Sequence, residues 1–457
     1  MVHVLWDASD LWGPLAVWGL SGLGAPFTLV RAVDIAEGVL QKENPSLLFV
    51  PGGFSRHKFA ALGEAGQKAI RSFVHEGGAY IGFCGGAGLA LSGEAALSLC
   101  PWKRAGYENR IQHYMSGHIY VKTNPNGEWR HPEKRTSKEA LASREETQFC
   151  RKAKLDGVSR PKGEGQDGPS QQTELCLAPR VLFPIWWPGR FEPQDDDTVT
   201  VLAEYDTPGP DFWLADLPVS SLPPSVFADW EEKYGFSPSP SFLQGEPCVI
   251  TGNYGKGRYI LAYSHLETPE SPAANAYLAK LLYELTGEPL SHTLVPAWNL
   301  CKTATSWNDP ALAAMWGGVQ SLFDAGKAAG MFFSRSPWLV GWRMGLPGAV
   351  CNTVRAQLFS IMANTPSDMA LAFWREKKNF LQPAFTAFIE RARSYLLAER
   401  LAMTLAKDLP ETLVPEKLMA ERTAVFGASG MAAHAGGLLG AILPELDELA
   451  YLQLRKK

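Results

Sequence analysis

The residue with the clearest chemical potential is Cys84, which lies in the motif Gly82-Phe83-Cys84-Gly85-Gly86. An apolar run at residues 79–83 precedes it and predicts a buried strand, and the small residues after it can begin a helix. This order is typical of a nucleophile elbow, where glycine neighbours prevent clashes around a strained turn. A helix start would favour the thiolate of Cys84, and the Gly85 N–H would point at a developing oxyanion. A buried structural cysteine is the alternative interpretation.

A cysteine nucleophile needs a base, and the base needs a third group that fixes its tautomer. His265-Leu266-Glu267 supplies both groups directly after an apolar run at residues 258–263. Residues two apart at the end of a strand lie on the same side, so Glu267 can orient the His265 imidazole. We therefore predict a catalytic set of Cys84, His265 and Glu267. A histidine in a surface turn is the alternative.

The elements that must position these residues alternate between strand and helix. Apolar runs predict strands at residues 2–6, 27–30, 46–50 and 79–83, and helices are predicted between them at 16–23, 34–40 and 63–76. This alternation predicts an α/β fold with a doubly wound, flavodoxin-like, mostly parallel sheet and helices on both faces. Ligands bind such sheets at the carboxyl ends of strands, so Pro51-Gly52-Gly53 and Cys84 should face one crevice.

The rest of the chain divides by its composition. Residues 124–172 are polar with few large apolar side chains, which predicts a disordered insertion or surface loop, with a binding tail as the sharper alternative. Strands are expected at 177–187 and 198–205, a loop at 217–241, a hairpin at 247–263 and a helix at 271–287. From about residue 290 the pattern is helical, with a Gly/Ala-rich helix at 426–443. We predict an α/β domain at 1–289 and an all-α C-terminal domain at 290–457.

Composition excludes several classes of function. The chain has 457 residues, 46% hydrophobic and 20% charged, and its net charge of -4 argues against nucleic-acid binding. Seven cysteines without C-x-x-C pairs predict neither a disulfide framework nor a zinc site, and they suit a reducing cytoplasm. The start of the chain lacks a basic segment, and no uninterrupted run of 18 apolar residues follows, so we expect a cytoplasmic protein without a membrane role. No cofactor and no metal are expected.

Three motifs together resemble the class I glutamine amidotransferase-like superfamily, whose triad runs Cys, His, Glu in that order. They are Pro51-Gly52-Gly53, the elbow around Cys84, and Gly255-Lys256-Gly257-Arg258 followed by His265-x-Glu267. The run at residues 50–88 resembles more closely the N-terminal domain of biotin-protein ligases and its free-standing bacterial relatives. The resemblance covers residues 1–287. The chain has no Gly-Arg-Gly-Arg-type loop, so the catalytic module of a biotin ligase is not expected.

The resemblance implies a role for each matching residue. Cys84 would be the nucleophile, His265 the base and Glu267 the group that orients it. The backbone N–H groups of Gly53 and Gly85 would form the oxyanion hole.

Three further residues are weaker candidates for a substrate pocket. Gly52 belongs to the loop that should face the crevice, and Arg56 follows that loop and could contact a carboxylate; an exposed loop residue is the alternative. Trp186 could form a wall of the pocket, and packing in the core is the alternative.

Two functions follow from these expectations. The first, which we favour, is an enzyme that hydrolyses or transfers the acyl group of a small-molecule amide through a thioester on Cys84. The second is a catalytically silent module of the same fold that binds a small-molecule amide or carboxylate ligand or has a regulatory role. In either case the helical C-terminal domain could dock a protein partner.

Overall fold

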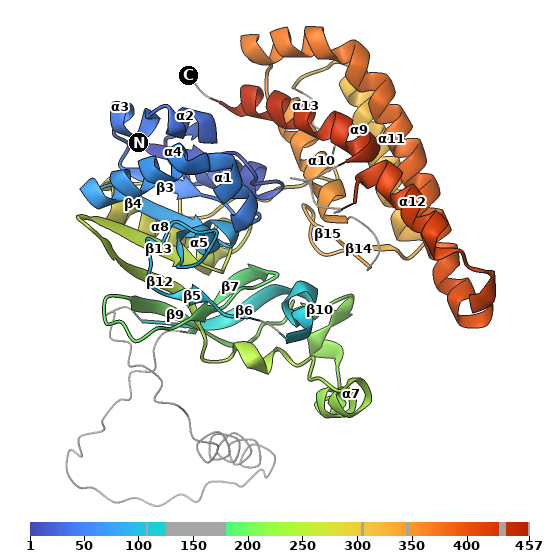
Figure 1. Ribbon diagram of the computed structural model, residues 1–457, viewed down its shortest axis with the longest axis horizontal. Helices are drawn as coiled ribbons and strands as arrows, with labels where there is room; N and C mark the ends of the chain where they lie inside the picture. Colours follow the sequence, from blue (N-terminus) through green and yellow to red (C-terminus); the bar gives the residue numbers. More distant parts are fainter. Residues whose placement is uncertain (107, 125–179, 303–305, 344–347, 429–435, 456–457) are drawn as a thin grey trace, which may run out of the picture.

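The computed structural model describes residues 1–106, 108–124, 180–302, 306–343, 348–428 and 436–455 (Figure 1). The polar insertion predicted at residues 124–172 lies outside the described residues, except for Asn124. The N-terminal part is a layered body built around a sheet, and the C-terminal helices stand beside it (Figure 1).

The sheet that organises the N-terminal part runs in the order β11-β10-β6-β9-β12-β13-β4-β3-β1-β2, with β7 paired to β6. The neighbours β2, β1, β3, β4 and β13 pair in parallel. The other described strands of this sheet pair antiparallel, beginning with the β12–β13 hairpin. The strands are β1 (Val2–Leu5), β2 (Phe27–Val30), β3 (Leu47–Val50), β4 (Ala79–Phe83), β6 (Met115–Thr123), β7 (Arg180–Trp186), β9 (Thr200–Pro208), β10 (Trp213–Leu214), β11 (Leu217–Pro218), β12 (Pro247–Tyr254) and β13 (Gly257–Ala262). A separate pair consists of β5 (Lys103–Arg104) and β8 (Phe191–Glu192).

The predicted fold class is wrong, because the sheet is mixed and the C-terminal part is not all-α. Parallel strands need crossover connections, and the alternation of strand and helix in the sequence stops after the elbow. The later strands are joined largely without crossover helices, and they pair antiparallel. The C-terminal part contains a small hairpin of β14 (Phe332–Ser334) and β15 (Val340–Trp342). Strands of three residues are too short to give an alternating pattern in the sequence.

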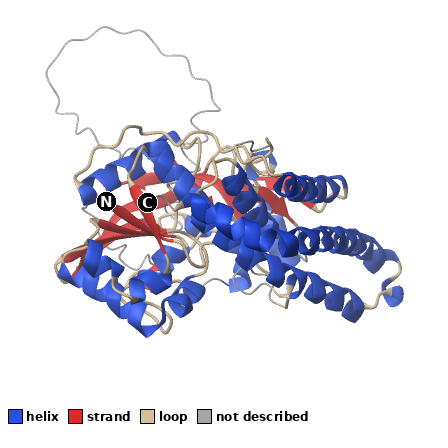
Figure 2. Cartoon of the chain, turned by 90° about the horizontal axis from the view of Figure 1, so that it is seen from above, coloured by secondary structure: helices blue, strands red, loops and turns tan. Residues whose placement is uncertain are grey.

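Helices lie on both faces of the parallel strands, as Figure 2 shows from above. On one face, α1 (Trp12–Leu23) and α8 (Pro272–Thr286) share a core cluster with Val4 of β1. On the other, α2 (Ala32–Ala36), α4 (Ser55–Glu76) and α5 (Gly85–Ala90) share a second cluster with Leu5. Successive side chains of a strand point to opposite faces, so each buried strand contributes to both clusters.

Two helical regions differ from the prediction. The helix expected at residues 34–40 is replaced by α2 and α3 (Val39–Glu43), because Gly38 between them takes a left-handed φ of 88°. Within the segment predicted as a loop, residues 217–241, the chain forms α7 (Val226–Tyr234). Its apolar residues Phe227 and Trp230 are three positions apart and pack partly buried against the core, but a helix of only nine residues gives this spacing too little length to stand out in a Pro/Ser-rich segment.

The C-terminal part contains α9 (Pro310–Ala328), α10 (Gly348–Met362), α11 (Asp368–Asp408), α12 (Pro415–Phe426) and α13 (Gly437–Leu454). The helix predicted at 426–443 begins only at Gly437, and residues 429–435 lie outside the described part. In Figure 1, α13 (red) runs from the other C-terminal helices toward α2.

The contacts of α13 join the two parts of the chain. Arg31 Nη2 lies 2.6 Å from Glu448 Oε2, and Trp6 Nε1 donates to Asp447 Oδ2 at 3.0 Å.

Among the described helices, none has the length and apolar character needed to cross a membrane.

Candidate active site

Cys84 directly follows β4 and has φ 48° and ψ -106°, a backbone conformation that a residue with a side chain rarely adopts. The neighbouring glycines make this turn possible. A Cβ on Gly82 would lie 2.5 Å from the Gly86 carbonyl oxygen, and a Cβ on Gly86 would lie 2.0 Å from the Val50 carbonyl oxygen. The turn therefore has the geometry of a nucleophile elbow, and it holds Cys84 half-buried at the carboxyl edge of the sheet.

The loop after β3 lies against the elbow, as the sequence predicts. A Cβ on Gly85 would lie 1.9 Å from the Gly53 carbonyl oxygen, so these two backbones are in direct contact. A Cβ on Gly52 would lie 2.8 Å from His265 Cε1 and 2.8 Å from Trp12 Cγ. Glycine at both positions is needed to bring the loop, the elbow and the histidine together.

His265 and Glu267 form a direct contact, with 2.8 Å between Nδ1 and Oε1. Both side chains are fully buried. They do not alternate along a strand as predicted, because β13 ends at Ala262 and the two residues lie in the turn that follows. Hydrogen bonds fix this turn: the His265 N–H donates to the Pro184 carbonyl at 3.0 Å, and Thr268 Oγ1 donates to the His265 carbonyl at 2.8 Å.

The surroundings of Cys84 and His265 favour the thiolate of the first and the imidazolium of the second. Burial alone would raise the pKa of Cys84, but a hydrogen bond to His265, the charges of His265 and Arg104 and the Gly85 N–H together lower it below the ordinary value. Burial would lower the pKa of His265, but the Glu267 carboxylate and Cys84 raise it to about 9. Apart from Cys84, His265 Nε2 has no hydrogen-bond partner among the described residues. The second ring nitrogen of His265 is therefore the one available to the thiol.

Trp12 stacks on His265, a contact that sequence reasoning missed. The ring centroids are 4.0 Å apart and the planes differ by 26°. Trp12 begins α1 just after β1, so it comes from another carboxyl-end loop of the parallel strands. Its position after a predicted strand was a signal in the sequence, but its aromatic character alone did not separate it from core tryptophans.

The C-terminal part reaches the site through a cluster of tryptophans. Trp338 lies between β14 and β15, and its ring packs edge-on against Trp12 at 6.4 Å and against Trp186 at 5.1 Å. Trp187, half-buried and left-handed with φ 57°, packs against Trp12 at 5.8 Å and Trp342 at 5.3 Å. Side chains from beyond residue 290 therefore pack against Trp12, the residue that stacks on His265.

The weaker sequence candidates fare differently. Trp186 is buried in this tryptophan cluster, and its Nε1 donates to Thr268 Oγ1 at 3.1 Å, so it supports the His265 turn. Arg56 is exposed in the first turn of α4, and no described contact links it to Cys84. Besides His265, a cation that acts on Cys84 is Arg104 of β5, which is exposed and which sequence reasoning missed.

A second polar network supports the segment after Glu267. His118 Nδ1 lies 2.8 Å from Asp211 Oδ2, and His118 Nε2 lies 2.8 Å from Ser271 Oγ. The order resembles a serine triad, but Ser271 is only 2% exposed and directly precedes α8. We interpret the network as a brace that holds this segment.

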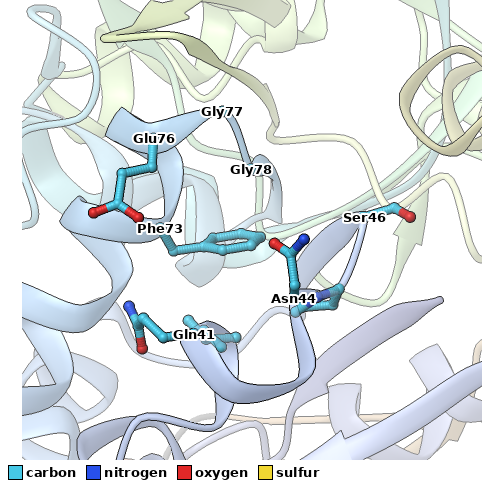
Figure 3. Close-up of a pocket in the computed structure, with 9 residues that line it drawn as sticks. Gln41, Asn44, Ser46, Phe73, Glu76, Gly77 and Gly78 are labelled. Atoms are coloured by element: carbon cyan, nitrogen blue, oxygen red, sulfur yellow. The ribbon is translucent and has the colours of Figure 1, made fainter.

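A pocket elsewhere on the sheet does not include these residues (Figure 3). It lies at the amino ends of β3 and β4, where Phe73, Asn44 and Gly78 line it. Cys84 lies at the opposite, carboxyl edge, where ligands of parallel sheets bind. Within the described part of the chain, no cluster of histidine, cysteine and acidic residues could hold a metal ion.

Comparison with protein families matches a part of the chain. The family described as biotin-protein ligase, N terminal, matches residues 31–93, which include the Pro51-Gly52-Gly53 loop and Cys84. This match supports a biotin-protein ligase-like N-terminal module in that part of the chain. It does not reach His265 or Glu267, and it does not confirm the wider amidotransferase-like superfamily. No curated protein matches the sequence.

Solved structures give only distant likenesses. A β-galactosidase from Bacillus circulans sp. alkalophilus has a TM-score of 0.31 and 9% identity, over 62% of this chain and 30% of that one. An exo-β-1,4-mannosidase from Opitutaceae bacterium strain TAV5 has a TM-score of 0.28 and 10% identity, over 62% of this chain and 34% of that one. A β-galactosidase from Rahnella sp. R3 has a TM-score of 0.27 and 13% identity, over 63% of this chain and 31% of that one. The chain spans about a third of the length of these proteins.

Proposed function

We propose that the chain is a cysteine-dependent enzyme that hydrolyses or transfers the acyl group of a small-molecule amide. One observation carries the proposal: the thiol of Cys84 lies beside an imidazole whose other nitrogen binds the buried Glu267. This is the arrangement that nucleophilic catalysis by cysteine requires. The family match at residues 31–93 supports the module that carries Cys84 but specifies no activity.

The proposed reaction has two steps. The Cys84 thiolate attacks the amide carbonyl carbon and forms a C–S bond, while the N–H groups of Gly53 and Gly85 stabilise the oxyanion. The His265 imidazolium gives its proton to the leaving nitrogen as the C–N bond breaks, which leaves a thioester and an amine or ammonia. Water, deprotonated by His265, then attacks the thioester and releases the acid and the thiol. Glu267 keeps the imidazole oriented throughout.

The pH dependence of Cys84 alkylation tests the proposal. Iodoacetamide is reacted with the wild type, with His265→Ala and with His292→Ala, and the modified sites are read by mass spectrometry. His292 is exposed and lies outside the site, so its variant is the matched control, and the exposed thiol of Cys301 is an internal reference. We expect an apparent pKa of Cys84 well below about 8.5 in the wild type and in His292→Ala, and near that value in His265→Ala.

The proposal that the chain is an enzyme would be wrong if Cys84 is unreactive, or if it titrates like free cysteine in all three proteins. The silent binding module would then take its place, and Cys84→Ala would leave ligand binding intact. If Cys84 shows the lowered apparent pKa, the next experiment is a screen of amide substrates in which Cys84→Ala serves as the inactive control.

We also propose that the chain divides into a domain at residues 1–289 and a domain at residues 290–457. The C-terminal domain would supply the surface that binds a protein partner. The two parts share a hydrophobic cluster that includes Trp12, Trp298 and Trp338. A chain that ends at residue 289 would expose this cluster to water. We therefore expect such a truncated chain to aggregate, which a solubility assay and size-exclusion chromatography can check.

A further inference from the structure

Lys58 is a fully buried lysine next to the proposed oxyanion hole. It lies in the first turns of α4, five residues after Gly53, and its exposure is 0%. Its ammonium donates to the Asp7 carbonyl at 3.1 Å and to Ser9 Oγ at 2.6 Å. The carboxylates of Asp10 and Asp7 act on its charge, although neither forms a direct ion pair with it among the described residues. Lysine is rarely buried without a paired charge, because the loss of hydration is costly.

The segment that Lys58 binds is strained. Residues 7–10 follow β1, and within them Ala8 and Asp10 have left-handed φ values of 52° and 51°. Residues with side chains adopt this conformation at a cost, so the surrounding contacts must hold it in place. The two hydrogen bonds from Lys58 are contacts of this kind, since they join the segment to α4.

The strained segment at residues 7–10 is in close backbone contact with Gly53 of the proposed oxyanion hole. A Cβ on Gly53 would lie 2.3 Å from the Ala8 carbonyl oxygen, and a Cβ on Gly85 would lie 1.9 Å from the Gly53 carbonyl oxygen. Contact therefore runs from Lys58 through residues 7–10 to Gly53 and then to Gly85. A shift in the segment would move the first of the two proposed N–H donors.

Electrostatics agrees with this position. Burial lowers the pKa of Lys58 to about 7, and the charges of Asp10, Asp7 and Cys84 oppose that shift. The amine is thus within electrostatic reach of the thiol, and both its charged and neutral forms keep N–H groups that can donate to the segment.

We propose that Lys58 is a positioning residue that sets the oxyanion hole by holding residues 7–10 against Gly53. The inference rests on the proposed function, since it assigns the residue that fixes the geometry of that same site. Lys58 does not touch the reacting atoms in this role; it acts through the backbone of Gly53.

Two reactions of Cys84 separate this role from a general structural one. Acylation by 4-nitrophenyl acetate joins the Cys84 sulfur to the acetyl carbon, passes through a tetrahedral oxyanion and expels 4-nitrophenolate with its bonding electrons. Alkylation by iodoacetamide displaces iodide without an oxyanion. Acylation therefore depends on thiolate and oxyanion hole, and alkylation depends on the thiolate alone. The ratio of the acylation rate to the alkylation rate therefore reports how strongly the oxyanion hole stabilises the tetrahedral intermediate.

The variants are Lys58→Met, which keeps the length of the side chain without its donors, and Lys68→Met as the control. Lys68 is exposed in the part of α4 that follows the non-helical Gly63. We expect Lys58→Met to lower the ratio of acylation to alkylation at least tenfold, a conservative part of the effect of removing one oxyanion donor. Lys68→Met should leave the ratio unchanged. If Lys58→Met does not fold, Ser9→Ala removes one acceptor of the ammonium and should lower the ratio severalfold.

The outcomes are distinct. If the ratio of acylation to alkylation stays at the wild-type value in a folded Lys58→Met or Ser9→Ala protein, the positioning role is wrong. The proposed enzyme function still holds in that case, provided that Cys84 of the wild type is alkylated with a lowered apparent pKa. A Cys84 that alkylates like free cysteine in the wild type overturns the proposed function and the inference with it.

Discussion

Trp12 and His265 stack with their ring centroids 4.0 Å apart, so an aromatic side chain from the loop after β1 holds the imidazole proposed as the base. Trp338 packs edge-on against the same Trp12 at 6.4 Å. The ring of His265 is therefore positioned by two parts of the chain, one before and one after residue 290. This relationship makes the C-terminal part a structural component of the site.

The first prediction concerns this aromatic contact. Trp338→Ala should lower the free energy of unfolding by about 3 kcal/mol, because it removes a large buried ring. It should also raise the apparent pKa of Cys84, since Trp12 loses a neighbour that keeps it on His265. Denaturant unfolding and the pH profile of alkylation check the two effects. Trp307→Ala is the control, because Trp307 is buried in the C-terminal part but packs against Trp374 and not against Trp12. An equal change in the Cys84 profile of both variants would contradict the prediction.

The second prediction concerns the charge of Glu267. This carboxylate raises the pKa of His265 to about 9 against the effect of burial. In Glu267→Gln the pKa of His265 should fall, so the imidazolium is lost at lower pH and no longer favours the Cys84 thiolate. Alkylation at pH 7 should slow about tenfold for each unit by which the pKa of Cys84 rises above 7, because the thiolate fraction falls by that factor. Wild-type acyl transfer, which needs the imidazolium as an acid, should decline as pH rises through about 9. That decline should begin at lower pH in the variant.

The third prediction compares two glycines of α5. Gly85→Ala places a Cβ 1.9 Å from the Gly53 carbonyl oxygen, so the backbone must move. We expect a loss of about 3 kcal/mol in stability and of most acylation activity. Gly88→Ala has ordinary room, with the nearest atom 3.4 Å away, and should be neutral or stabilising by up to about 1 kcal/mol. Thermal unfolding and the acylation burst measure both; a Gly85→Ala protein that matches Gly88→Ala would show that the two loops are not packed as described.

The fourth prediction concerns Asp447, through which α13 meets the N-terminal part. Burial raises the pKa of this carboxyl from 3.8 to about 6, and Arg31 and Trp6 oppose the shift. Between those values the folded chain holds a proton that the unfolded chain has lost, so stability declines as pH rises through this window. Relative to Asp447→Asn, the wild type should therefore lose stability between about pH 4 and pH 6. Denaturant midpoints at both pH values measure the difference, and a constant difference would contradict the raised pKa.

The strands before residue 90 were predictable because their patterns are local, although the helix predicted at residues 34–40 is divided at Gly38. The runs at 27–30 and 79–83 are β2 and β4 in the structure, and Cys84 lies at the strand-to-helix turn that its glycine neighbours predict. Local patterns failed where partners come from far along the chain. The antiparallel half of the sheet depends on pairing between β6, β9 and β12, and nothing in the periodicity of one strand specifies the direction of its neighbour.

The sequence by itself determined which residues could do chemistry, because cysteine, histidine and glutamate have their reactivity in their side chains and the glycines around Cys84 permit one kind of turn. Only the tertiary structure decided which groups surround them. Trp12, Lys58 and Trp338 come from three separate segments. In the sequence the two tryptophans resemble ordinary core residues and Lys58 resembles an ordinary surface lysine, until their contacts are known. The physical reason is that chemical identity is a property of one residue, whereas burial, stacking and charge proximity are properties of residues that folding brings together from distant positions.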